Sequence, residues 1–88
     1  MRTAMKLGFV YEDGAGGVTC ALCDVDDGHD LDGDAGFRAA VSEGCGQLAW
    51  NRTEWDFRFP AERLQCGAVI VKCRPRGGAP ALEAFAGE

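Results

Sequence analysis

The pattern of hydrophobic and polar residues in the first third of the chain is typical of two β-strands. Residues 4–12 and 18–25 are rich in β-branched and aromatic side chains, and the segment 13–17 between them contains three glycines. Glycine permits the positive φ angles that a tight reversal needs. We therefore predict an N-terminal β-hairpin whose tip lies at residues 13–17.

Three aromatic residues in the second half of the chain alternate with charged residues. Trp55, Phe57 and Phe59 are separated by Asp56 and Arg58. This period of two is typical of a strand that has one buried face and one solvated face. The alternation predicts a strand over residues 54–59.

Shorter patterns predict the remaining elements of the second half. Residues 47–50 favour a strand that ends in a polar turn at 51–53, and residues 61–65 favour a short helical turn. The apolar, β-branched run at 66–73 is suited to a central strand. The proline- and glycine-rich residues 74–80 then predict a linker.

A single amphipathic stretch at residues 35–43 predicts the main helix. Three apolar residues in this stretch share one helical face, and Asp34 precedes it as a plausible N-cap. Gly44 and Gly46 disfavour continuation of the helix, so we expect the helix to end there.

These elements predict one small α+β domain, with a mainly antiparallel sheet of four to five short strands packed on one main helix. A chain of 88 residues has room for one hydrophobic core. We assign residues 1–76 to this domain and residues 77–88 to a flexible or loosely docked C-terminal tail, in which residues 81–86 favour a frayed helix.

The charge of the chain is unevenly distributed. The formal net charge is -5. Residues 1–44 carry three basic and nine acidic side chains, whereas residues 45–88 carry six basic and five acidic ones. Six aspartates lie within eleven residues: Asp24, Asp26, Asp27, Asp30, Asp32 and Asp34. The net negative charge argues against direct binding of nucleic acid. The six aspartates concentrate this charge in one segment of the chain.

The five cysteines leave a zinc-binding module open as an alternative. Cys20 and Cys23 have the spacing of a zinc knuckle, but the residues between them favour a strand, so structural thiols are the preferred interpretation. The first residues lack the features of a secretory signal peptide, and no apolar run is long enough to span a bilayer. We therefore expect a soluble cytoplasmic protein with reduced thiols, no membrane association, no metal and no cofactor.

Neither calcium binding nor catalysis is favoured by the motifs of the chain. From Asp30 the aspartates match the first positions of an EF-hand loop, but Ala35 replaces the required glycine and Val41 replaces the bidentate glutamate. His29 is the only histidine, and it lies in an acidic segment that we expect to be flexible. The sequence therefore predicts no catalytic residues and no enzyme activity.

The functional expectation is a non-enzymatic interaction protein that inhibits or regulates a protein partner. Closely spaced carboxylates imitate the charge of a phosphate backbone, so they suit a basic, nucleic-acid-binding site on that partner. Small acidic phage proteins directed against defence systems, anti-CRISPR proteins among them, occupy this class of size and charge, as do immunity proteins and antitoxins that neutralise a toxin. The six aspartates are the expected contacts, with Trp50 and Arg58 as additional surface candidates. The sequence leaves the oligomeric state open.

Overall fold

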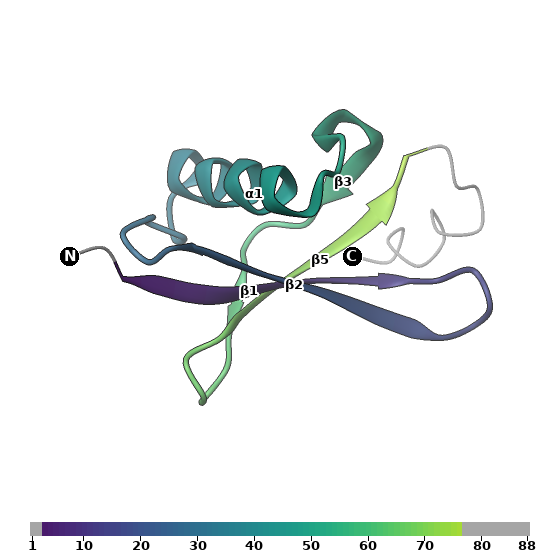
Figure 1. Cartoon of the computed structure of the whole chain (residues 1–88), viewed down its shortest axis with the longest axis horizontal. Helices are drawn as coiled ribbons and strands as arrows, with labels where there is room; N and C mark the ends of the chain where they lie inside the picture. Colours follow the sequence, from purple (N-terminus) through teal and green to yellow (C-terminus); the bar gives the residue numbers. More distant parts are fainter. Residues whose placement is uncertain (1–2, 77–88) are drawn as a thin grey trace.

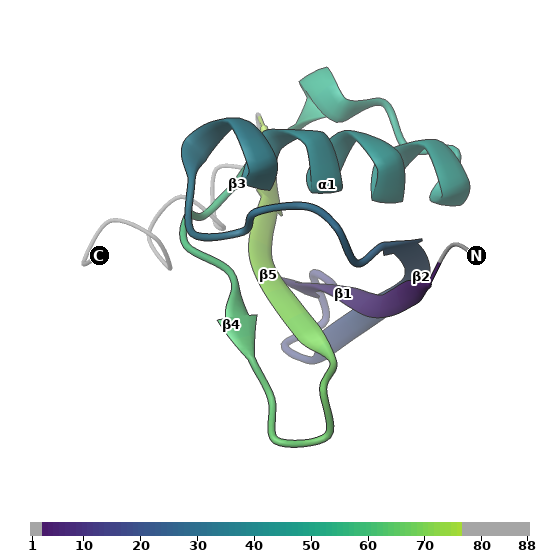
Figure 2. The same cartoon turned by 90° about the vertical axis from the view of Figure 1, so that its left-hand side faces the viewer.

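The structure, a computed structural model, describes residues 3–76 and places one helix along one face of a mixed five-stranded sheet (Figures 1 and 2). The elements in chain order are β1 (Ala4–Glu12), β2 (Val18–Asp26), α1 (Asp34–Leu48), the 3-10 helix η1 (Arg52–Glu54), β3 (Trp55–Phe57), β4 (Glu62–Arg63) and β5 (Val69–Pro75). The predicted small α+β domain is confirmed. The predicted tail at 77–88, with its frayed helix, lies outside the described residues.

The N-terminal hairpin is confirmed. β1 and β2 pair antiparallel along their whole length, from Ala4 opposite Asp26 to Glu12 opposite Val18. The Asp13 carboxylate accepts hydrogen bonds from the backbone N–H of Ala15 (2.8 Å) and Gly17 (3.1 Å) and so holds the turn. Local turn chemistry therefore accounts for this hairpin.

A parallel pairing joins the two ends of the domain. β1 runs parallel to β5, with Leu7 opposite Val69 and Val10 opposite Lys72. β5 also pairs antiparallel with β3 and β4 on its other side, so the strand order is β2-β1-β5-β3. β5 is thus a central strand, as its apolar composition predicts, although it spans Val69–Pro75 and not residues 66–73.

The hydrophobic core lies between the sheet and α1. Alternate residues of β1, β2 and β5 face the helix, because successive side chains of a strand point to opposite faces. The buried apolar residues are Leu7, Phe9, Cys23, Val25, Leu31, Phe37, Ala40, Val41, Cys45, Val69, Val71 and Cys73. Among residues 3–76, no helix is long and apolar enough to cross a membrane.

The predicted ends of the helix are wrong at both termini. The N-cap is Gly33, which makes no side-chain capping bond, and Asp34 lies within the first turn. The helix continues through Gly44 and Gly46 to Leu48. A Cβ atom at position 44 would lie 2.9 Å from the Phe9 ring, so this glycine allows the helix to approach the sheet closely. Packing against the sheet therefore outweighs the low helix propensity of glycine.

Three further predictions for the second half need correction. Residues 47–50 are not a strand, because α1 occupies the first two of them. The predicted strand at 54–59 is reduced to β3, and η1 precedes it. The predicted helical turn at 61–65 is instead β4, which pairs with the edge of β5. Pairing with β5 decides both strand assignments: β4 forms a short hairpin with β5, whereas β3 pairs with residues that lie farther along the chain.

Candidate functional site

The candidate site is the acidic loop, which we define as residues 24–34, joining the end of β2 to the start of α1 (Figure 1). Five of its six aspartate residues are exposed, and Asp26 is half-buried. Leu31 lies in the middle of the loop and is buried in the core at 3% exposure. The loop is therefore anchored by an apolar side chain while its carboxylates face solvent.

Two aspartates organise the backbone of the acidic loop. The Asp26 carboxylate accepts a hydrogen bond from the Gly28 N–H at 2.9 Å, and the Asp30 carboxylate accepts one from the Asp32 N–H at 3.1 Å. Aspartate side chains commonly close turns by accepting from the N–H group two residues ahead. These bonds explain locally why a segment so rich in aspartate reverses direction twice.

A glycine in the first turn of α1 allows the helix to begin directly against the loop. A Cβ atom at Gly36 would lie 1.9 Å from the backbone oxygen of Asp30. No side chain fits in that space, because real Cβ atoms do not approach other atoms so closely. Gly36 therefore permits the close packing of the loop on the helix.

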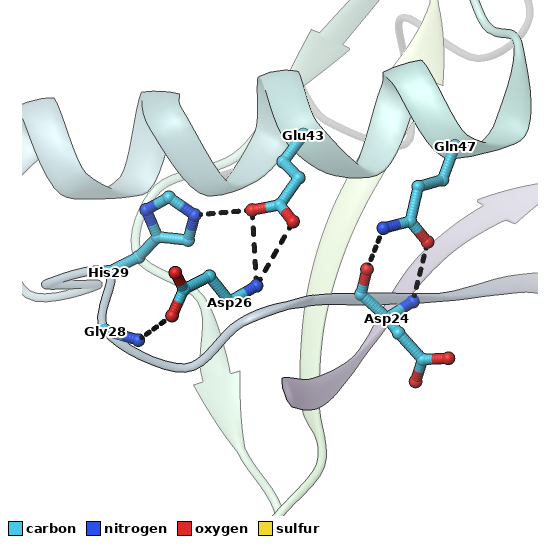
Figure 3. Close-up of polar contacts among 6 residues, drawn as sticks. All are labelled: Asp24, Asp26, Gly28, His29, Glu43 and Gln47. Carbon is cyan, nitrogen blue, oxygen red and sulfur yellow. Dashed lines mark hydrogen bonds and ion pairs between the residues drawn. The ribbon is translucent and has the colours of Figure 1, made fainter. Parts of the chain in front are cut away.

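Glu43 and Gln47, one turn apart on α1, hold the acidic segment from above (Figure 3). The Glu43 carboxylate lies 2.8 Å from Nε2 of His29 and also accepts from the Asp26 N–H at 3.2 Å. The Gln47 side chain accepts from the Asp24 N–H at 3.1 Å and donates to the Asp24 carbonyl. His29 is half-buried, and its contact with Glu43 orients the imidazole toward α1.

Among residues 3–76, basic side chains pair with the two ends of the acidic loop. Lys6 pairs with Asp24 at 2.8 Å, and Arg38 pairs with Asp34 at 3.1 Å. Both pairs are more than half exposed, so each contributes little to stability. Between them, the exposed Asp27 carboxylate accepts from the Thr3 hydroxyl, and Asp30 accepts from a backbone N–H. Neutral donors satisfy these oxygens but leave the negative charge in place.

The acidic loop runs along α1, from Asp24, which bonds to Gln47 in the last turn, to Asp34 in the first turn. The helix has 15 residues, a length of about 22 Å at 1.5 Å per residue, and Trp50 follows its last turn. Trp50 is half-buried, and its ring stacks on Trp55 with centroids 4.2 Å apart. Trp50 therefore packs at the rim of the core, at the opposite end of α1 from Asp30 and Asp34, which lie at the first turn.

Arg58 lies in a third region of the molecule. It follows β3 and is half-buried, and its backbone N–H donates to the Lys72 carbonyl of β5 at 2.8 Å. With Pro60, Glu62 and Ile70 it lines a depression beside β5. Arg58 and the acidic loop are thus carried by different elements of the fold.

Cys20 and Cys23 point to opposite faces of the sheet. Cys23 is buried beneath α1, where its thiol lies 3.4 Å from the Leu7 carbonyl. Cys20 is exposed on the other face, where its sulfur would meet a Cβ atom at Gly8. The two thiols therefore do not converge on one tetrahedral ion. Within residues 3–76, no three potential ligands cluster as a metal site.

Sequence reasoning missed the residues that support the acidic loop from α1. Glu43 and Gln47 are four residues apart, and therefore lie on one helical face. Ending the helix at Gly44 removed Gln47 from that face. A helix extended to Leu48 would have aligned both side chains toward the edge of β2.

Comparisons of the chain with protein-family models, with curated proteins and with solved structures find no match. The functional argument therefore depends on the geometry and charge of the site itself.

Proposed function

We propose that this protein acts by binding, not by catalysis, and that it inhibits or regulates a protein partner by presenting the acidic loop to a basic, nucleic-acid-binding site. The observation that carries the proposal is the exposed group formed by Asp27, Asp30 and Asp32, which lies between two neutralised ends. Carboxylates at this density imitate the charge of a phosphate backbone.

The support from α1 favours binding over simple solubility. A loop already held by Leu31, His29 and Glu43 loses little conformational entropy when a partner binds. A segment that served only to keep the chain soluble would not need these contacts. Preorganised charge also increases the rate of association with an oppositely charged surface.

The proposal is tested with the triple variant Asp27→Asn, Asp30→Asn and Asp32→Asn. Asparagine keeps a side-chain oxygen as hydrogen-bond acceptor, so the loop should keep its shape while it loses three charges. Wild-type protein immobilised on a resin should capture a nucleic-acid-binding protein from the source cells, and added DNA or RNA should release it. The triple variant should lose this capture.

A matched control removes the same charge elsewhere. Glu12, Glu54 and Glu62 are exposed and lie outside the acidic loop, so their combined change to Gln should leave capture unchanged. Equal loss of capture in both triple variants would show that total charge, and not this loop, determines binding. Capture that persists in the Asn variant, or that DNA and RNA do not compete, would contradict the proposal.

A further inference from the structure

The outer edge of the sheet is formed by β2, which is hydrogen-bonded on one side only. In an antiparallel pair, the backbone groups of alternate residues point toward the partner strand and those of the others point away. Asp27 donates to the Thr3 carbonyl on the β1 side, whereas Asp24 bonds to Gln47 on the outer side. The even-numbered residues of β2 therefore direct their N–H and C=O groups outward.

α1 covers the outer edge of β2 only along the C-terminal half of the strand. Gln47 bonds both backbone groups of Asp24, and Glu43 accepts from the Asp26 N–H (Figure 3). Toward the tip of the hairpin, β2 extends beyond the end of α1 (Figure 1). Val18, Cys20 and Leu22 belong to the first half of β2. Within residues 3–76, no element pairs with this part of the edge.

The uncovered part of the edge is apolar and free of charge. Val18 is 70% exposed and Leu22 is 62% exposed, and both project from the sheet face opposite α1. Residues 18–23 contain no charged side chain, although the chain as a whole has a net charge of -5. An exposed, apolar and unpaired edge is a template for strand addition, and proteins usually protect such edges with charge or proline.

We propose that two copies of this chain associate by antiparallel pairing of their β2 edges. Cys20 of one copy then lies opposite Cys20 of the other, and Val18 lies opposite Leu22 of the second copy. The three outward-facing residues of each copy form about six main-chain hydrogen bonds across the axis. Because the interface has two-fold symmetry, the pair of Val18 and Leu22 occurs twice.

The paired stretch itself introduces no charge repulsion in this antiparallel register. A charge-free strand meets a charge-free strand, and Asp24 remains beyond the paired stretch with its partner Lys6. The two acidic loops lie at opposite ends, with Asp26 of each copy separated by about 40 Å at 3.3 Å per residue. This distance is several Debye lengths at physiological ionic strength, so the loops do not repel one another appreciably.

The small paired stretch predicts a weak dimer. Only about five residues of each strand face the other copy before Gln47 blocks the edge, so the buried area falls below that of a permanent dimer. The dimer should therefore form in a concentration-dependent way. Sedimentation velocity from about 1 µM to about 1 mM covers the range over which such complexes dissociate.

The test compares Leu22→Lys with Leu64→Lys. Both leucines are exposed, at 62% and 43%, but only Leu22 lies on the β2 edge. Leu22→Lys should weaken association by about tenfold or more, because symmetry removes two cross-strand contacts and a lysine then lies on each edge. Leu64→Lys should dimerise as the wild-type protein does.

A backbone variant separates edge pairing from other contacts of Leu22. Cys20→Pro removes an N–H group that points outward, and edge strands tolerate proline at such positions. Circular dichroism should show that the fold is retained, and sedimentation should show monomers. A wild-type chain that stays monomeric to about 1 mM would overturn the proposal. Dimers unaffected by Leu22→Lys would also overturn it, because they would require a different surface.

Discussion

At the scale of single residues, burial divides the five thiols into two groups. Cys23, Cys45 and Cys73 lie in the core, whereas Cys20 and Cys66 are exposed. Burial raises the pKa of Cys23 to about 11, with a smaller contribution from the nearby Asp24 carboxylate, and burial raises the pKa of Cys73 to about 12. The core thiols are therefore protonated at neutral pH, which lowers their reactivity as nucleophiles.

These pKa shifts predict a loss of stability in alkaline solution. The unfolded thiols ionise near their ordinary pKa of 9.0, while the folded thiols keep their protons until pH approaches 11 or 12. The folded state then binds more protons, so the free energy of unfolding falls as pH rises from about 9 to about 11. Each thiol contributes up to about 1.4 kcal/mol per pH unit. Below about pH 8 both states are protonated, and these groups contribute no pH dependence.

Urea unfolding at several pH values measures this slope. The double variant Cys23→Ala and Cys73→Ala should be less stable at neutral pH but should show a shallower alkaline decline. The control variant Cys20→Ser and Cys66→Ser changes only exposed thiols, so its slope should match that of the wild-type protein. Equal slopes in all three proteins would contradict the assignment.

At the scale of elements, local chemistry predicts the hairpin but not the extent of the helix. The turn at residues 13–17 depends on Asp13 and on glycines with positive φ, all of which are adjacent in sequence. The end of α1 depends instead on Phe9, which is far away in the chain and packs on Gly44. Propensity treats Gly44 as a helix breaker, whereas the fold uses it as a point of close contact.

Alanine substitutions at Gly44 and Gly46, near the C-terminal end of α1, should have opposite effects. Gly44→Ala gains about 1 kcal/mol of helix propensity but places a Cβ atom 2.9 Å from the Phe9 ring. Overpacking costs about 1–3 kcal/mol, so the net change should be a destabilisation of about 1 kcal/mol. At Gly46 no atom lies within 4 Å of an added Cβ, so Gly46→Ala should stabilise the protein by about 0.5–1 kcal/mol.

Urea unfolding of both variants measures the difference. A stabilising Gly44→Ala would show that the helix can move away from the sheet at little cost. The same comparison explains the error in the sequence prediction, because two glycines of one helix have equal propensity and different surroundings.

At the scale of the whole molecule, the parallel pairing of β1 with β5 is the feature that local sequence patterns predict least well. These strands are separated by more than fifty residues in the chain, and no turn specifies their register. The acidity of the loop was visible in the sequence, but its support from α1 depends on the relative placement of β2 and the helix. The position of the negative charge could therefore be predicted from the sequence, whereas the contacts that hold the acidic loop against α1 could not.

The concentration of carboxylates in one held loop should cost stability, because like charges repel most strongly when they cannot move apart. The triple variant Asp27→Asn, Asp30→Asn and Asp32→Asn should therefore be more stable than the wild-type protein by a few tenths to about 1 kcal/mol at low ionic strength. About 0.5 M salt should reduce this difference by screening the repulsion. Urea unfolding at both salt concentrations measures the effect.

A triple variant that is less stable at both concentrations would show that the carboxylates stabilise the fold. A gain in stability that disappears with salt would instead show that the charges of the acidic loop destabilise the fold. This behaviour is expected of a surface that is retained for binding a basic partner.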